Sequence, residues 1–164
     1  MTSLVKTHSR SLIVFCALII FTQAIGSYTT FSSVRTWYAT LDKAPWTPPN
    51  WVFGPVWTVL YISLAIIGWR LWISFSGTVT EKLRQPAIRY YFLQLFFNFL
   101  WSPLFFGMRF PALAFADIVL LIIFAFLTLY HIAKINKILA WAFIPYYLWI
   151  SYAASLNGAI VIMN

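Results

Sequence analysis

The sequence predicts an all-α integral membrane protein, a bundle of five transmembrane helices formed by residues 1–164 as a single domain. Of the 164 residues, 62% are hydrophobic and only 9% are charged, against about 25% charged residues in an ordinary soluble domain. So few charges do not keep a small domain soluble, and so apolar a chain is not disordered. The apolar residues also occur in stretches close to the roughly 20 residues with which a helix crosses a bilayer.

The five apolar stretches lack the alternation of a membrane β-barrel, and nothing repeats at a fixed period. A signal peptide is the alternative for the first stretch, because Lys6 and Arg10 precede it and Gly26 lies in a small-residue segment. The apolar and aromatic residues beyond Gly26 favour a retained helix. The predicted spans are residues 12–31, 54–73, 88–106, 111–133 and 138–162.

The basic residues between the spans predict the orientation of the chain. With five spans, eight Lys and Arg residues lie on the side of the N-terminus and three, Arg35, Lys43 and Arg109, lie on the other side. The positive-inside rule then places the N-terminus in the cytoplasm and the C-terminus on the opposite side. The net charge of +8 therefore reports topology, and because the charges form no basic face, nucleic acid is not an expected partner.

The connection between the first two spans, residues 32–53, is long and aromatic. It contains Trp37, Tyr38, Trp46 and Trp51 together with three prolines, one of which is Pro48. Proline fixes its own φ and restricts the preceding residue, so the segment is stiff and not helical throughout. An aromatic belt at headgroup depth is one interpretation of such tryptophans. The clustering favours a lid over a binding site.

Polar and aromatic side chains form stripes on three of the predicted helices. Gln94, Asn98 and Ser102 recur every four residues, which places them on one helical face. Polar groups at bilayer depth are costly unless they face the protein interior, so such stripes indicate either a ligand site or interhelical hydrogen bonds. The other two stripes are Trp57 with Tyr61, and Tyr146 with Trp149, Ala153 and Asn157.

Asp117 is the one acidic residue inside a predicted span. A charge at the bilayer centre costs on the order of 2.5–3.5 kcal/mol on insertion scales. We therefore expect Asp117 to face inward, where it is protonated or accepts a hydrogen bond from a neighbouring helix or loop. Proton coupling is the alternative role. Pro103 and Pro145 are expected to kink their helices.

The sequence lacks the residues that several common kinds of catalytic and cofactor site require. No lysine lies mid-span to form a Schiff base, and the chain has no paired carboxylates, phosphate-binding glycine loop or Ser-His-Asp set. Cys16 is the single cysteine and the histidines are isolated, so no metal site is expected. The tryptophans and tyrosines instead suit a flat, apolar, conjugated ligand held by stacking and a few polar contacts.

Three long strings resemble the tryptophan-rich sensory protein or translocator protein family, also called the peripheral benzodiazepine receptor family. They are WTPPNWVFGPVW from Trp46, QLFFNFLWSPLFFG from Gln94 and WAFIPYYLWISYAASLN from Trp141. The pair Ala116-Asp117 and the segment from Arg35 to Tyr38 also fit, so the resemblance covers nearly four-fifths of the chain. The cholesterol motif proposed for this family is absent, because no Lys or Arg follows Lys137, and this favours a bacterial-type member.

The resemblance implies a five-helix membrane protein, often a homodimer, whose first loop closes a pocket. Members bind porphyrins such as protoporphyrin IX and isoquinoline-type drugs, so a membrane receptor or sensor with porphyrin as ligand is the expected function, with no obligatory cofactor. Light- and oxygen-dependent porphyrin breakdown, associated with the positions of Trp57 and Trp149, and transport of porphyrins or other lipophiles are the alternatives, so enzyme activity stays open. The implied ligand-binding residues are Tyr38, Pro48, Trp57, Tyr61, Asn98, Trp101, Trp149 and Ala153, with Asp117 and Gln94 as structural polar residues.

Overall fold

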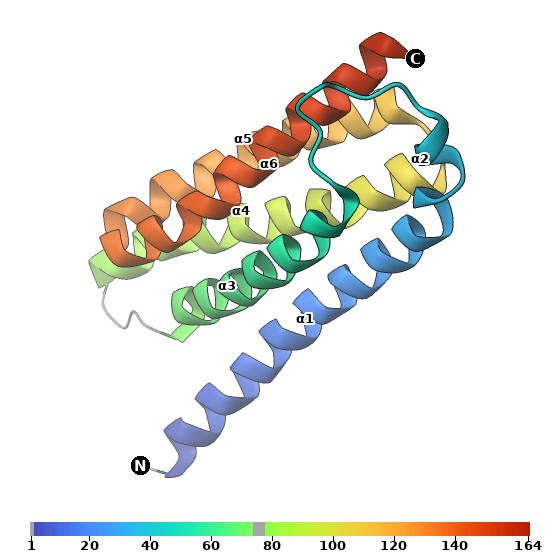
Figure 1. Ribbon diagram of the computed structural model, residues 1–164. Coiled ribbons are helices and arrows are strands. Elements are labelled where there is room, and N and C mark those ends of the chain that lie inside the picture. Colours follow the sequence, from blue (N-terminus) through green and yellow to red (C-terminus); the bar gives the residue numbers. More distant parts are fainter. Residues whose placement is uncertain (1, 74–77) are drawn as a thin grey trace.

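The computed structural model describes residues 2–73 and 78–164, with side chains from residue 10 to 73 and from 82 to 164. Within these ranges the chain is helical and contains no strand. Five long helices form a bundle whose N-terminus and C-terminus lie at opposite ends (Figure 1). The elements are α1 (Thr2–Val34), α2 (Trp37–Thr40), the 3-10 helix η1 (Asn50–Val52), α3 (Phe53–Ile73), α4 (Thr78–Ser102), the π-helical segment η2 (Pro103–Gly107), α5 (Pro111–Ile135) and α6 (Lys137–Met163).

Four of the five long helices could span a membrane. Among the described residues, four helical segments are long and apolar enough to cross a bilayer: Arg10–Val34, Asn50–Ile73, Pro111–Ile135 and Lys137–Met163. The predicted span at 88–106 lies in α4 and η2, but α4 begins much earlier, at Thr78. Neither α4 nor η2 is among these four segments of the described chain, so the predicted count of five spans is not confirmed. The first half of α4 carries the basic residues Lys82, Arg84 and Arg89. Lys6 is one of the eight basic residues predicted to lie on the side of the N-terminus, and its side chain lies outside the described part of the chain.

The connections at the C-terminal half of the chain are short and locally determined. Pro111 occupies the first turn of α5, where its missing N–H costs nothing. Asn136 caps α6 because its side-chain oxygen accepts a hydrogen bond from the backbone N–H of Leu139, at 3.1 Å. The turn between η2 and α5 places Arg109 at φ 54°. These tight turns make α4, α5 and α6 successive antiparallel neighbours.

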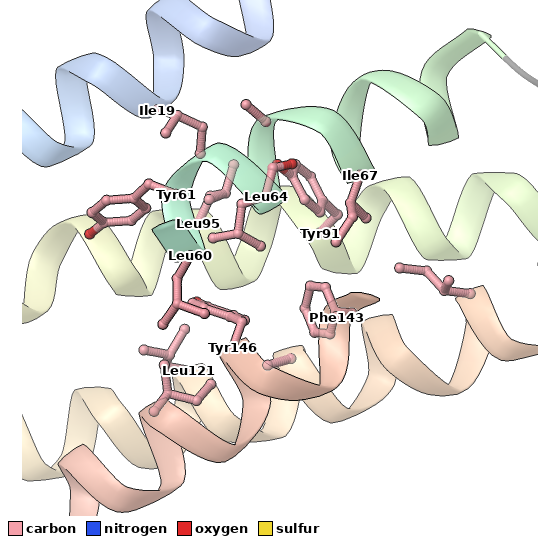
Figure 2. Packing of buried hydrophobic residues seen from close by; sticks show 14 of the residues in the cluster. Ile19, Leu60, Tyr61, Leu64, Ile67, Tyr91, Leu95, Leu121, Phe143 and Tyr146 are labelled. Carbon is pink, nitrogen blue, oxygen red and sulfur yellow. The ribbon is translucent and has the colours of Figure 1, made fainter. Parts of the chain in front are cut away.

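The core lies where α3, α4, α5 and α6 meet, with α1 against one side (Figure 2). Leu64, Leu71 and Phe143 have no exposed surface there. Tyr91 is 1% exposed, and its hydroxyl donates a hydrogen bond to the carbonyl of Leu64 at 2.7 Å. Gly68 allows this packing, because a Cβ at this position would lie 2.6 Å from the Tyr91 ring.

Large apolar side chains also cover the outside of the bundle. Exposed ones occur on all four candidate spans, for example Ile20 on α1, Ile62 on α3, Ile123 on α5 and Leu148 on α6. A helix that is apolar on its outer as well as its inner face suits a hydrocarbon environment, because water would be a poor solvent for it. The exposed surface therefore agrees with residence in a bilayer.

Candidate ligand-binding site

A cavity of about 350 Å³ lies between the helices at the end of the bundle that holds α2 and the C-terminus. This volume falls within the roughly 300–1,000 Å³ of small-molecule sites. The wall is mostly aromatic and aliphatic. Exposed wall residues, namely Ser27, Phe31, Asn50 and Gly54, mark where the cavity meets the outside between α1 and the beginning of α3. Of the predicted ligand-binding residues, Tyr38, Trp57, Tyr61, Asn98, Trp101 and Ala153 line it.

Trp57 and Tyr61 present a flat surface on one side of the cavity. Their positions one helical turn apart on α3 bring the two rings into a stack with centroids 5.1 Å apart and planes inclined by 28°. Stacked rings of this kind expose a broad π face to a neighbouring planar group. The Tyr61 hydroxyl is already engaged, since it donates to Oδ1 of Asn98 at 2.7 Å.

The polar stripe of α4 forms interhelical hydrogen bonds. Asn98 Nδ2 donates to the Tyr146 hydroxyl at 3.2 Å, and that hydroxyl in turn donates to Oε1 of Gln94. Gln94 is fully buried and does not line the cavity, which agrees with a structural role. A ligand site and interhelical hydrogen bonds were the two interpretations of this stripe, and Asn98 fits both. It borders the cavity, and it joins α3 to α6 through its hydrogen bonds with Tyr61 and Tyr146.

The next turn of α4 binds its neighbours in the same way. Trp101 Nε1 donates to Oδ1 of Asn157 at 3.0 Å, and Asn157 Nδ2 donates to the carbonyl of Pro111 at 2.9 Å. Ser102 Oγ donates to the carbonyl of Gly26 at 3.0 Å and lies 2.8 Å from the Thr29 hydroxyl. With its N–H thus satisfied inside the protein, Trp101 offers the cavity its ring rather than its polar atom.

Tyr38 closes the cavity from the lid, defined here as residues 35–52. The ring is buried and meets Phe105 and Phe106 edge-on, with centroids 6.1 and 5.6 Å away. Burial raises the pKa of the Tyr38 hydroxyl above its ordinary value of 10.0. The hydroxyl is therefore protonated at neutral pH and can donate a hydrogen bond.

The lid is fastened to α6 at two points. The Tyr152 hydroxyl donates to the carbonyl of Trp46 at 2.7 Å. The Asn164 side chain pairs with the backbone of Asp42, accepting from its N–H at 2.9 Å and donating to its carbonyl at 3.1 Å. Figure 1 shows the segment between α2 and α3 running along this end of α6.

Two predicted ligand-binding residues, Pro48 and Trp149, do not line the cavity. The Trp149 ring instead contacts Phe53 and Tyr152, with centroids 5.8 and 5.6 Å away, and its Nε1 is buried without a hydrogen-bond partner among the described residues. Because Phe53 lines the cavity, Trp149 lies one ring behind its wall. The structure therefore does not place Trp57 and Trp149 on a common cavity surface.

Asp117 faces inward, as its position in a span requires, and is 6% exposed. It does not line the cavity. Its Oδ2 has no hydrogen-bond partner in the described part of the chain. The structural hydrogen bond expected for this carboxyl group is thus not observed at that oxygen.

The contribution of α1 to the wall was not predicted from the sequence. Thr22, Gly26 and Thr30 line the cavity at successive four-residue intervals. Small and polar residues at this spacing are a recognisable signal of a close helix contact. The π-helical segment was also unforeseen, and it supplies Phe105 and Phe106 beneath the lid.

These features define a class of protein, a helical membrane protein of several spans with a ligand-sized aromatic cavity under a fastened lid. Residues 12–163 match the TspO/MBR family, and the chain belongs to that family. It is 42% identical to "Tryptophan-rich protein TspO" of Archaeoglobus fulgidus over 85% of this chain and 87% of the relative. It is also 33% identical to "Tryptophan-rich sensory protein" of Cereibacter sphaeroides, over 78% and 77%, and 34% identical to human "Translocator protein", over 81% and 78% of the two chains.

Proposed function

We propose that this protein is a membrane receptor or sensor that binds porphyrins, such as protoporphyrin IX, and similar flat lipophilic ligands in the cavity. The observation that carries the proposal is the wall itself. It offers the rings of Trp57, Tyr61 and Trp101, while the polar atoms of Tyr61 and Trp101 are satisfied within the protein. A wall of this kind binds through stacking and apolar contact, which favours a planar conjugated ligand.

Tryptophan fluorescence tests the proposal. Protoporphyrin IX titrated into the purified protein should quench the emission saturably. Trp57→Phe and Trp101→Phe should each weaken binding by about 3- to 10-fold, the equivalent of one aromatic contact of about 0.5–1.5 kcal/mol. The control is Trp141→Phe, because Trp141 is 72% exposed on the outside of α6. Quenching that does not saturate, or that is weakened equally by all three changes, would contradict the proposal.

We also infer that α4 with η2 crosses the membrane as a fifth span, with the N-terminus in the cytoplasm. The combined helix extends from Thr78 to Gly107 and packs along α5, a candidate span, in antiparallel orientation. At 1.5 Å per residue it is longer than the roughly 30 Å hydrocarbon core. A reporter fused to the C-terminus should be active on the side opposite the cytoplasm, and cytoplasmic activity would contradict this topology.

A further inference from the structure

The end of the bundle opposite the lid is strongly basic. Figure 1 shows that the end of α3, the start of α4 and the turn between α5 and α6 share this end. Exposed cations from every long helix gather there. They are Arg10 on α1, Arg70 on α3, Lys82 and Arg89 on α4, Lys134 on α5 and Lys137 on α6. These six residues form the basic end.

Contacts between the helices fix the basic end as one surface. Nη1 of Arg84 on α4 donates to the carbonyl of Trp72, the last turn of α3, at 2.9 Å. Trp72 also lies beside α1, with its ring centroid 6.3 Å from that of Phe15. On the other side, the rings of Tyr90 on α4 and His131 on α5 stack with centroids 5.5 Å apart. The cations next to these rings in sequence therefore lie at similar depth along the bundle.

Acidic side chains do not balance this charge. The chain has three acidic residues. Asp42 lies in the lid and Asp117 near the beginning of α5, far along the helix from Lys134. Glu81 precedes the cations of α4, and its side chain lies outside the described part of the chain. Within the described part, no ion pair involves the six cations, so the basic end attracts anions from its surroundings.

Exposed aromatic rings lie one helical turn from two of these cations. The Lys134 ammonium is 3.9 Å from the centroid of the Tyr130 ring and donates to its hydroxyl at 2.6 Å. On α6, Trp141 follows Lys137 by one turn, and its side chain is 72% exposed. Tyrosine and tryptophan beside lysine are typical of the headgroup depth of a bilayer. The cations are therefore at the level of lipid phosphates, and the rings are at the level where the acyl chains begin.

We propose that the basic end binds anionic phospholipids of the surrounding leaflet, with the headgroup phosphate against Arg89, Lys134 and Lys137. The acyl chains then lie along the exposed rings of Tyr130 and Trp141. A soluble anion would satisfy the cations but leave these rings uncovered, which favours a lipid. A zwitterionic lipid has the same phosphate but carries its own cation, so the net negative charge of an anionic lipid decides the preference. This site is separate from the cavity and does not depend on the ligand proposed for it.

Native mass spectrometry of the full-length protein in detergent tests the proposal, by measuring dissociation constants of phosphatidylglycerol and phosphatidylcholine with the same acyl chains. The wild type should bind phosphatidylglycerol more tightly. Lys134→Gln and Lys137→Gln should each weaken phosphatidylglycerol binding about threefold and the double variant about tenfold, as exposed charge pairs do. Binding of phosphatidylcholine should not change, which also shows that the variants remain folded. Added salt should weaken only the binding of phosphatidylglycerol.

Two controls locate the effect. Replacement of Lys134 and Lys137 together by arginine keeps both charges and should keep the preference for phosphatidylglycerol. Replacement of Arg35 and Lys43 by glutamine removes two cations at the lid end and should also keep it. Equal affinity of the wild type for the two lipids, or equal losses from the glutamine pairs at the two ends, would overturn the proposal. Displacement of phosphatidylglycerol by inorganic phosphate at constant ionic strength would overturn it as well, because the site would then bind a soluble anion without the acyl chains.

Discussion

The two ends of the bundle are built on different principles. Around Gly68 the helices approach closely, and Leu64, Leu71 and Phe143 leave no exposed surface. At the lid end the helices are held apart by a cavity, and polar side chains such as Asn98 and Ser102 join them by hydrogen bonds. The difference indicates that the first end supplies most of the packing energy, whereas the second uses directional bonds to keep a cavity open.

The largest effect is expected at the close-packed end, from Gly68→Ala. The added Cβ would lie 2.6 Å from the Tyr91 ring and 2.8 Å from the Phe15 ring, and both rings are confined by their neighbours. Overpacking of this kind costs about 1–3 kcal/mol. Thermal unfolding in detergent, followed by circular dichroism, should show a clear loss of stability.

Gly54→Ala is the matched control on the same helix, because a Cβ at Gly54 has no atom within 4 Å. It should leave stability unchanged or slightly raise it, since alanine favours helix. Similar losses for both variants would show that α3 is not clamped at Gly68.

A smaller effect is expected from the hydrogen bonds at the lid end. Tyr146→Phe removes the group that accepts from Asn98 and donates to Gln94, while Tyr61→Phe removes a single donor to Asn98. Interhelical hydrogen bonds in membranes are worth about 0.6 kcal/mol on average. The free energy of unfolding should therefore fall more for Tyr146→Phe than for Tyr61→Phe.

The control is Tyr147→Phe, because Tyr147 is half-buried on the same helix and no hydrogen bond from its hydroxyl occurs within the described part of the chain. Its stability should match that of the wild type. If Tyr147→Phe cost as much as Tyr146→Phe, the network would not be what joins the helices at this end.

The smallest effect on stability is expected at the lid fastening, where the change should appear in ligand kinetics. Asn164→Ala removes two exposed hydrogen bonds to the backbone of Asp42. A lid that opens more often should release protoporphyrin IX about threefold faster in stopped-flow measurements, the equivalent of a fraction of a kcal/mol. Ser155→Ala is the control, because its hydroxyl bonds only within α6. Equal rates for wild type and Asn164→Ala would contradict the fastening.

The apolar runs predicted the helix bounds well where the whole helix is apolar, as in α5. They failed at the beginning of α4, because hydropathy detects residence in the bilayer and not helix formation. That helix extends back to Thr78 through a polar segment, since its backbone bonds are satisfied within the helix whatever its side chains face.

Helical periodicity predicted which face of α6 points into the bundle, but not which edge of that face lines the cavity. At roughly 100° per residue, Trp149 lies at one edge of the stripe centred on Ala153, and Ile150 lies at the other. The cavity is on the Ile150 side, so Trp149 packs against Phe53 instead. Which edge of a stripe faces a cavity depends on the neighbouring helices, and no single helix contains that information.

A structure of the protein with bound protoporphyrin IX would show whether the lid end of the bundle is the ligand site. The macrocycle should lie inside the cavity, against the rings of Trp57 and Trp101 and beneath Tyr38. A macrocycle bound on the lipid-facing surface, or between helices at the Gly68 end, would contradict it.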